Sequence, residues 1–146
     1  MPLVNFFCED ISFHLPKPRK TRAWIKQVIT HEGGELKSIA FIFCSDPYLH
    51  QINLQYLKHD TYTDIITFDN SENDGEIEGD IFISIERIKE NSKNLRKSFQ
   101  EEIHRVMIHG VLHLLGYSDK TKNQKAEMRS KEDLCLSLSP VPRETF

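Results

Sequence analysis

The sequence contains few cysteines, no long apolar run and little net charge, and each shortage excludes a class of protein. Its three cysteines are an odd number without a Cys-x-x-Cys pair, which disfavours both a disulfide framework and a cysteine-based zinc site. Reduced cysteines fit a cytoplasmic location. No apolar stretch approaches the roughly 20 residues that cross a bilayer, and the first residues lack the pattern of a signal peptide. We therefore expect a cytoplasmic protein without membrane association. Its formal net charge of −3 is close to neutral, so the overall charge of the chain does not attract it to nucleic acid.

The length and the order of the expected elements indicate one domain. A chain of 146 residues can bury a substantial core, and no repeat or linker divides it. Apolar and β-branched runs predict strands at residues 3–8, 38–44, 63–68 and 77–85. Capping signals and helical spacing predict helices at residues 20–31, from 46, at 85–91, from 98 and at 121–138. Residues 1–146 should therefore form a single α+β domain around a four-stranded mixed sheet.

Residue types at three predicted helix starts indicate specific caps. Asp46 followed by Pro47 is the expected N-cap of the second helix, with the proline at its first position. Ser98 with Glu101 is the expected capping box of the helix that begins at 98. Thr121 with Gln124 forms a second expected capping box, at the start of the last helix.

The run His109-Gly-Val-Leu-His113-Leu-Leu-Gly116-Tyr-Ser-Asp119 carries the strongest functional signal. His109 and His113 are four residues apart in an otherwise apolar segment, so both imidazoles project from one face of a buried helix. Buried polar rings need partners, and a divalent metal would partner both at once. This helix should be the central one, with its histidines on the floor of a cleft against a strand edge.

A third ligand is expected from the turn that follows. Gly116 is placed where a left-handed residue would end the helix and reverse the chain, which would bring Asp119 within reach of the histidines. Three protein ligands with one open position are typical of catalytic zinc sites. The alternative is that Asp119 caps the next helix, although the capping box at Thr121 would leave the aspartate free.

The residue after the first histidine argues against a protease. Metalloprotease helices carry a glutamate there as the general base, whereas this chain has Gly110. The ligand spacing is therefore metzincin-like without the proteolytic base. Asp64 and Asp80 follow or lie within predicted strands and are candidate bases, with sheet-end hydrogen bonding the favoured role for Asp80. His59 and His104 are further candidates, with a structural or solvated role favoured for each.

The chain resembles the YbeY family, bacterial metal-dependent endoribonucleases of ribosomal RNA maturation. The histidine run matches the family signature His-Gly-x-Leu-His-Leu-x-Gly-Tyr-Asp-His, with Asp119 in the place of the third histidine. Two further family segments are present: Asn53 to Tyr56 followed by Thr-Asp-Ile-Ile-Thr-Phe at 63–68, and Gly-Asp-Ile-Phe-Ile-Ser at 79–84. The three segments follow the family's order, and the implied fold covers nearly the whole chain.

The resemblance implies an enzyme that cleaves single-stranded RNA during late processing of small-subunit ribosomal RNA. Its partners would be ribosomal RNA and the small ribosomal subunit. One Zn²⁺ per chain would be held by His109, His113 and Asp119, and an aspartate ligand makes other divalent metals more competitive. Asp64 and His109 are the candidate catalytic residues.

A second departure from the family concerns phosphate binding. Leu57 stands where the family has an arginine, so Lys58, Arg22 or Arg105 would have to contact substrate instead. This departure keeps open the alternative of a non-catalytic ribosome-assembly factor with a structural metal. A metal amidase or peptidase is a separate alternative, which would need a base from elsewhere because Gly110 replaces the glutamate. Two basic clusters, around residues 17–26 and 87–97, either contact phosphates or are solvated helix faces.

Overall fold

The computed structural model describes residues 2–58 and 63–140, which form an α+β fold around one mixed sheet. The strands lie in the order β1-β2-β4-β3. β1 (Leu3–Cys8), β2 (Glu35–Cys44) and β4 (Glu76–Ser84) are parallel, and β3 (Ile65–Asp69) runs antiparallel to β4 along one edge. The predicted four-stranded mixed sheet is therefore confirmed, and β3 is one of its two edge strands.

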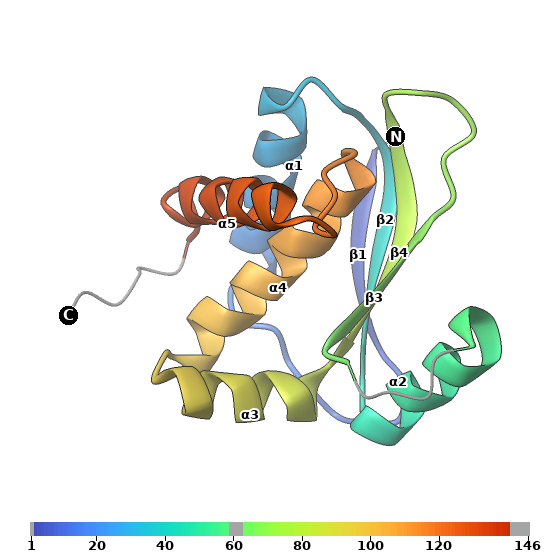
Figure 1. Ribbon diagram of the computed structural model, residues 1–146, viewed down its shortest axis with the longest axis vertical. Coiled ribbons are helices and arrows are strands. Elements are labelled where there is room, and N and C mark those ends of the chain that lie inside the picture. Colours follow the sequence, from blue (N-terminus) through green and yellow to red (C-terminus); the bar gives the residue numbers. More distant parts are fainter. Residues whose placement is uncertain (1, 59–62, 141–146) are drawn as a thin grey trace.

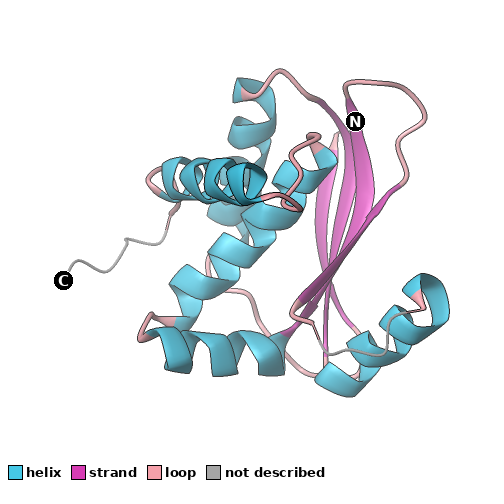
Figure 2. Cartoon of the chain, viewed as in Figure 1, coloured by secondary structure: helices cyan, strands magenta, loops and turns pink. Residues whose placement is uncertain are grey.

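Helices cover the two faces of the sheet unequally (Figures 1 and 2). The main core lies between one face and four helices: α1 (Pro18–His31), α3 (Ile85–Leu95), α4 (Phe99–Leu114) and α5 (Lys122–Leu136). The other face holds a smaller core under α2 (Asp46–Ile52) and the π-helical turn η1 (Asn53–Leu57). Among the described residues, no helix combines the length and apolarity needed to cross a membrane.

α4 is the central helix, as its sequence predicts. Eleven of its residues are buried, and it contacts α1, α3, α5, β3 and β4. Gly110 lies where α4 meets the sheet: a Cβ there would come within 3.0 Å of the side chains of Ile65 and Ile81. Position 110 therefore points at the sheet, and a glutamate in this place would not reach the face that carries the histidines.

The helix starts agree with the sequence at two of three caps. The Ser98 hydroxyl accepts the amide of Glu101, and Thr121 and Gln124 form the full reciprocal capping box of α5. The prediction for α2 was wrong by one residue: Ser45 is the N-cap, its hydroxyl accepting the Tyr48 amide at 3.2 Å. Asp46 is the first helical residue, and its carboxylate is instead bound by Arg87 at 2.8 Å.

Several element ends also differ from the prediction. β2 begins at Glu35 rather than 38, because pairing with β4 starts as early as Glu76. β3 begins at Ile65 rather than 63, and α3 continues past 91 to Leu95. These differences depend on pairing and packing that a local pattern does not contain.

Candidate metal centre

His109 and His113 lie on successive turns at the end of α4 and face each other. Their Nε2 atoms are 3.0 Å apart and their ring centroids 4.5 Å apart. Their side chains are 22% and 29% exposed, so both rings reach the surface from an otherwise buried helix. The geometry leaves the Nε2 lone pairs converging on one point, as the four-residue spacing predicts.

A carboxylate from α5 fixes the ring of His109. Its Nδ1 lies 2.6 Å from Oε2 of Glu132, and the other oxygen of Glu132 accepts Nη1 of Arg105 at 2.8 Å. Burial opposes the charged imidazolium, but the hydrogen bond and charge of Glu132, with the charges of Asp119 and Asp64, outweigh it and raise the pKa of His109. A proton held on Nδ1 leaves Nε2 as the donor atom for a metal, the arrangement that metal-binding histidines commonly show.

The turn after α4 fixes the second histidine and delivers the third donor. Gly116 has φ 106°, and the amides of Gly116 and Tyr117 bond the carbonyls of His113 and Leu112, which is a Schellman turn. The Tyr117 carbonyl lies 2.9 Å from Nδ1 of His113 and accepts its proton. Beyond the turn, Oδ2 of Asp119 comes to 3.3 Å and 3.4 Å from the Nε2 atoms of His109 and His113.

The three donor atoms fit a tetrahedral divalent ion. Two zinc–nitrogen bonds of about 2.0–2.1 Å at a tetrahedral angle place their nitrogens roughly 3.3 Å apart. The distances among His109, His113 and Asp119 are 3.0, 3.3 and 3.4 Å. This is the one group of three or more possible ligands that meets in the described part of the chain. Because the capping box of α5 is formed by Thr121, Asp119 is not needed as a helix cap.

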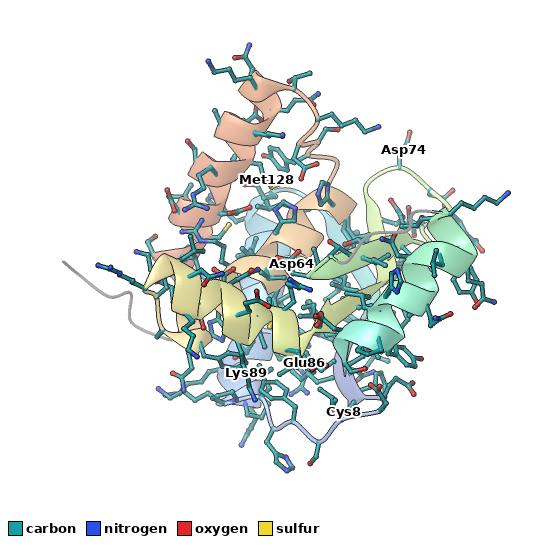
Figure 3. The ribbon with its side chains drawn as sticks, turned by 60° about the horizontal axis from the view of Figure 1, so that its bottom comes forward. Cys8, Asp64, Asp74, Glu86, Lys89 and Met128 are labelled. Atoms are coloured by element: carbon teal, nitrogen blue, oxygen red, sulfur yellow. The ribbon has the colours of Figure 1, made fainter. Side chains whose placement is uncertain are left out.

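A cavity of about 490 Å³ opens over these donor atoms. It is lined by Thr63, Asp64, Ile65, Thr67, Asp69, His109, His113, Leu114 and Asp119, so β3 forms one wall and α4 the floor. Figure 3 shows Asp64 at the centre of the view, where the chain enters β3. Burial raises the pKa of the Asp64 carboxyl, and Asn91 donates to it at 3.3 Å. The described lining contains three aspartates and neither lysine nor arginine.

The basic residues suggested by the sequence lie at different distances from this cavity. Arg105 lines a neighbouring cavity and is held by Glu132 and Asp133, at 2.8 and 2.7 Å. The structure does not bring Arg22 to the site: its guanidinium donates to the Val4 carbonyl at 2.7 Å, on the strand farthest from β3. Lys58 is exposed at the end of η1 and does not line the cavity.

The other candidate bases are accounted for as follows. Asp80 accepts the Asn70 side chain at 3.2 Å and does not line the cavity, which fits hydrogen bonding within the sheet. His104 is 1% exposed and stacks on Trp24, so its position is structural. His59 lies outside the described residues.

Glu132, whose carboxylate holds the ring of His109, was not predicted from the sequence. A signal for it exists: Met128, Glu132 and Cys135 are spaced four and three apart and are all buried in α5. A carboxylate on the apolar stripe of a helix is costly unless something pairs with it. Its position therefore indicates a buried partner, although the sequence does not say which one.

Comparisons with known proteins agree with the observed fold. The family model described as Endoribonuclease YbeY matches residues 8–139. The Endoribonuclease YbeY of Amoebophilus asiaticus is 51% identical over 97% of both chains, and that of Cytophaga hutchinsonii is 50% identical over 92% of this chain and 94% of its own. A solution structure from Thermotoga maritima shares the fold, with a TM-score of 0.67 at 23% identity over 93% of this chain and 88% of its own. The chain therefore belongs to the YbeY family of endoribonucleases.

Proposed function

We propose that this protein is a metal-dependent endoribonuclease that cleaves single-stranded RNA in the late maturation of small-subunit ribosomal RNA. The observation that carries the proposal is the convergence of His109, His113 and Asp119 on one point under an open cavity. Family membership supplies the substrate class, because the matched relatives are named as endoribonucleases. We further propose that residues 1–146 act as one unit in the cytoplasm on ribosomal RNA within the small ribosomal subunit.

The proposed cofactor is one Zn²⁺ per chain, held by His109, His113 and Asp119. When bound, such an ion supplies Lewis-acid stabilisation of phosphate charge and makes a water ligand more acidic. An aspartate in place of a third imidazole lowers the positive charge of the site, which makes harder divalent metals more competitive. The chain's own contribution is rigid placement: Glu132 and the Tyr117 carbonyl hold both rings with Nε2 facing the cavity.

Asp64 is the proposed general base. It lines the cavity with His109, and its burial raises the pKa of the carboxyl toward the range in which a base exchanges protons readily. The proposed step at Asp64 is removal of a proton from the attacking hydroxyl, while Asn91 keeps the carboxylate oriented by its hydrogen bond. His109 acts from the floor of the same cavity, as a donor atom to the metal and as the ring that Glu132 orients.

Substrate approach must overcome an acidic cavity wall. With Asp64, Asp69 and Asp119 in the lining, a phosphate is repelled unless a cation is present. We propose that phosphate contacts come from the bound metal, from Arg105 beside the cavity and from the exposed Lys58. Arg22 is not part of this proposal because it is engaged with β1.

Three variants test the proposal on a single-stranded ribosomal RNA fragment, with metal content measured beside cleavage. His113→Ala should lose both the metal and the cleavage. Asp64→Asn should keep the metal and lower the cleavage rate by about 10²–10⁴, the contribution of a positioned base. Asp80→Asn, an aspartate outside the cavity, is the matched control. Chelator-resistant cleavage, or full activity in His113→Ala, would refute the proposal.

One observation favours a second candidate, a ribosome-assembly factor in which the metal is structural. Leu57 is 42% exposed at the end of η1, in the position of the family's arginine, and the described lining of the metal cavity contains no lysine or arginine. If this candidate holds, wild type binds metal and RNA but does not cleave, and Leu57→Arg leaves that unchanged. The amidase alternative is disfavoured because Gly110 points at the sheet and has no room for a base.

A further inference from the structure

A second cavity, of about 260 Å³, lies directly beside the metal cavity. The two share Asp64, Ile65 and His109. The remaining lining residues of the second cavity come from α4 and α5: Glu102, Arg105, Val106, Arg129 and Glu132. A polymer whose reacting phosphate lies over His109 would therefore place its neighbouring residue in or over this second cavity.

Glu102 is the unusual residue of this second cavity. It is 6% exposed, and its carboxylate forms no hydrogen bond or ion pair within the described chain. Burial, followed by the negative charge of Asp64, raises the pKa of Glu102 to about 7. The other buried carboxylate here is fully engaged, since Glu132 is bound by His109 and Arg105. A buried carboxylate that faces a cavity without a partner is costly in the free protein and is available to a ligand with N–H donors.

Arg129 supplies the second half of the recognition chemistry. It is exposed on α5 at the wall of the same cavity and forms no ion pair within the described chain. Arg105, by contrast, is held by Glu132 and Asp133. The cavity thus offers one free guanidinium near its entrance and one free carboxylate inside, a pattern that suits a ligand with a phosphate at one end and N–H donors at the other.

We propose that this cavity receives one nucleobase of the RNA, next to the phosphate over the metal centre, and that Glu102 selects guanine while Arg129 binds the adjoining phosphate. The proposal rests on the proposed function and specifies its substrate. An ionised carboxylate is an acceptor only, and guanine is the base that presents two adjacent N–H donors on one edge. Glu102 is seven residues before His109, two helical turns or about 10 Å along α4, which suits the nucleotide beside the reacting one.

The size of the cavity limits the ligand to one base. Pockets for complete small-molecule ligands measure about 300–1,000 Å³, and this one is slightly smaller. It has an apolar side in Ile65 and Val106, against which a flat ring can pack. A ribose and its phosphate would remain outside, toward Arg129 and the metal cavity.

Binding of the four nucleoside 5′-monophosphates to the zinc-loaded protein, followed by amide chemical shifts, tests the cavity without cleavage. The phosphate is common to the four probes, so differences report on the base. GMP should bind about tenfold more tightly than AMP, CMP or UMP, as expected for a bidentate contact. Glu102→Gln should remove that advantage, because glutamine replaces one of the two acceptor oxygens with an NH₂ group, which can only donate. Glu127→Gln, an exposed glutamate of α5 outside this cavity, should keep it.

Arg129→Gln separates the phosphate contact from base selection. It should weaken all four monophosphates alike and preserve the ratio between them, whereas Lys125→Gln, an exposed lysine of α5 outside this cavity, should change nothing. Equal binding of the four probes by wild type, or a GMP advantage that survives in a correctly folded Glu102→Gln, overturns the inference.

Cleavage of an RNA with randomised sequence then connects the cavity to the reaction. Sequencing of the product ends should show guanine enriched beside the cut in wild type and not in Glu102→Gln. Cleavage without base preference leaves the proposed function standing and overturns the inference. If wild type cleaves no RNA, the proposed function fails, and the monophosphate titration alone decides whether the cavity selects guanine.

Discussion

Two histidines of α4, five residues apart, show how differently one helix can use the same side chain. His104 is 1% exposed, stacks on Trp24 with ring centroids 5.1 Å apart, and has the Ser139 hydroxyl 2.7 Å from its Nδ1. Burial lowers its pKa to about 4. His109 is also largely buried, but the carboxylate of Glu132 reverses the outcome and raises its pKa.

The difference lies in the partner and not in the depth of burial. A neutral hydroxyl partner leaves desolvation to dominate at His104, so this ring remains uncharged and serves packing. A carboxylate partner gives His109 a fixed proton on Nδ1 and a defined donor at Nε2. The part of α4 around His104, which packs on α1, is therefore structural, whereas the part around His109, beside β3, belongs to the candidate metal centre.

The largest effect that would sharpen this comparison concerns stability in acid. Because the folded pKa of His104 is about 4 against 6.5 in the unfolded chain, the unfolded state binds the proton first as pH falls below 6.5. The free energy of unfolding should then decrease by up to about 3 kcal/mol by pH 4 through this residue alone. Above pH 6.5 the ring is neutral in both states and its contribution is constant.

Glu102 acts in the opposite direction over the same range. Its folded pKa of about 7 exceeds the usual 4.5, so protonation of the folded state stabilises the fold as pH falls from 7 to 4.5.

The contribution of His104 is therefore measured as the difference in unfolding free energy between wild type and His104→Phe, by urea unfolding from pH 7.5 to 4.5. His104→Phe should be less stable than wild type at neutral pH and should recover part or all of that difference in acid. A pH-independent difference would refute this prediction, because it would mean that His104 takes up its proton over the same pH range in the folded and the unfolded state.

The second prediction removes the partner that distinguishes His109. Glu132→Gln keeps an acceptor but loses the charge, so the ring is held less firmly and is a weaker donor. Metal affinity should fall by about 10- to 100-fold, the usual effect of removing an outer partner of a metal-bound histidine. Competition with a chromophoric chelator measures it.

Asp133→Asn is the matched control for that variant. Asp133 is the next residue of α5 and also pairs with Arg105, at 2.7 Å, whereas the carboxylate bound to Nδ1 of His109 is that of Glu132. Its replacement should leave metal affinity within about twofold, since the pair is partly exposed and such pairs contribute little. Equal losses in the two variants would show that Arg105, and not the Glu132 contact, holds the site together.

Local features of the site were predictable from sequence because each depends on short spacing. The shared face of His109 and His113 follows from helical geometry, and the turn at Gly116 follows from the left-handed conformation that glycine favours. The capping box at Thr121 settles which residue caps α5. The four-stranded sheet was also predictable, because each strand is a short apolar run that can be recognised in the local sequence.

Features that depend on how α5 crosses α4 were not predictable. Glu132 is 23 residues beyond His109, and Glu102 becomes part of a cavity only because α5 lies across it. Charge alone was also a poor guide to substrate contacts. Arg22 proved to bind the carbonyl of Val4, whereas Arg129, which the sequence did not single out, lines the second cavity.

The smallest expected effect concerns the loop that carries Asp119. The Tyr117 hydroxyl donates to Glu32 at 2.5 Å, and Lys131 holds the other oxygen of Glu32 at 3.1 Å, which joins the loop to α1 and α5. Tyr117→Phe removes the hydroxyl but keeps the backbone carbonyl that binds His113. A hydrogen bond to a charged group contributes about 1.5–3 kcal/mol to stability. We expect only part of this energy to affect the position of Asp119, so metal affinity should fall by roughly two- to fivefold.

Tyr48→Phe removes a tyrosine hydroxyl on the opposite face of the sheet and is the control, with no change in metal affinity expected. Glu32→Gln should match Tyr117→Phe, because both variants weaken one link between the loop and α1. If Tyr117→Phe loses as much affinity as Glu132→Gln, the loop and not the His109 partner limits the geometry of the site. The difference between His104 and His109 would then depend on Asp119 more than on Glu132.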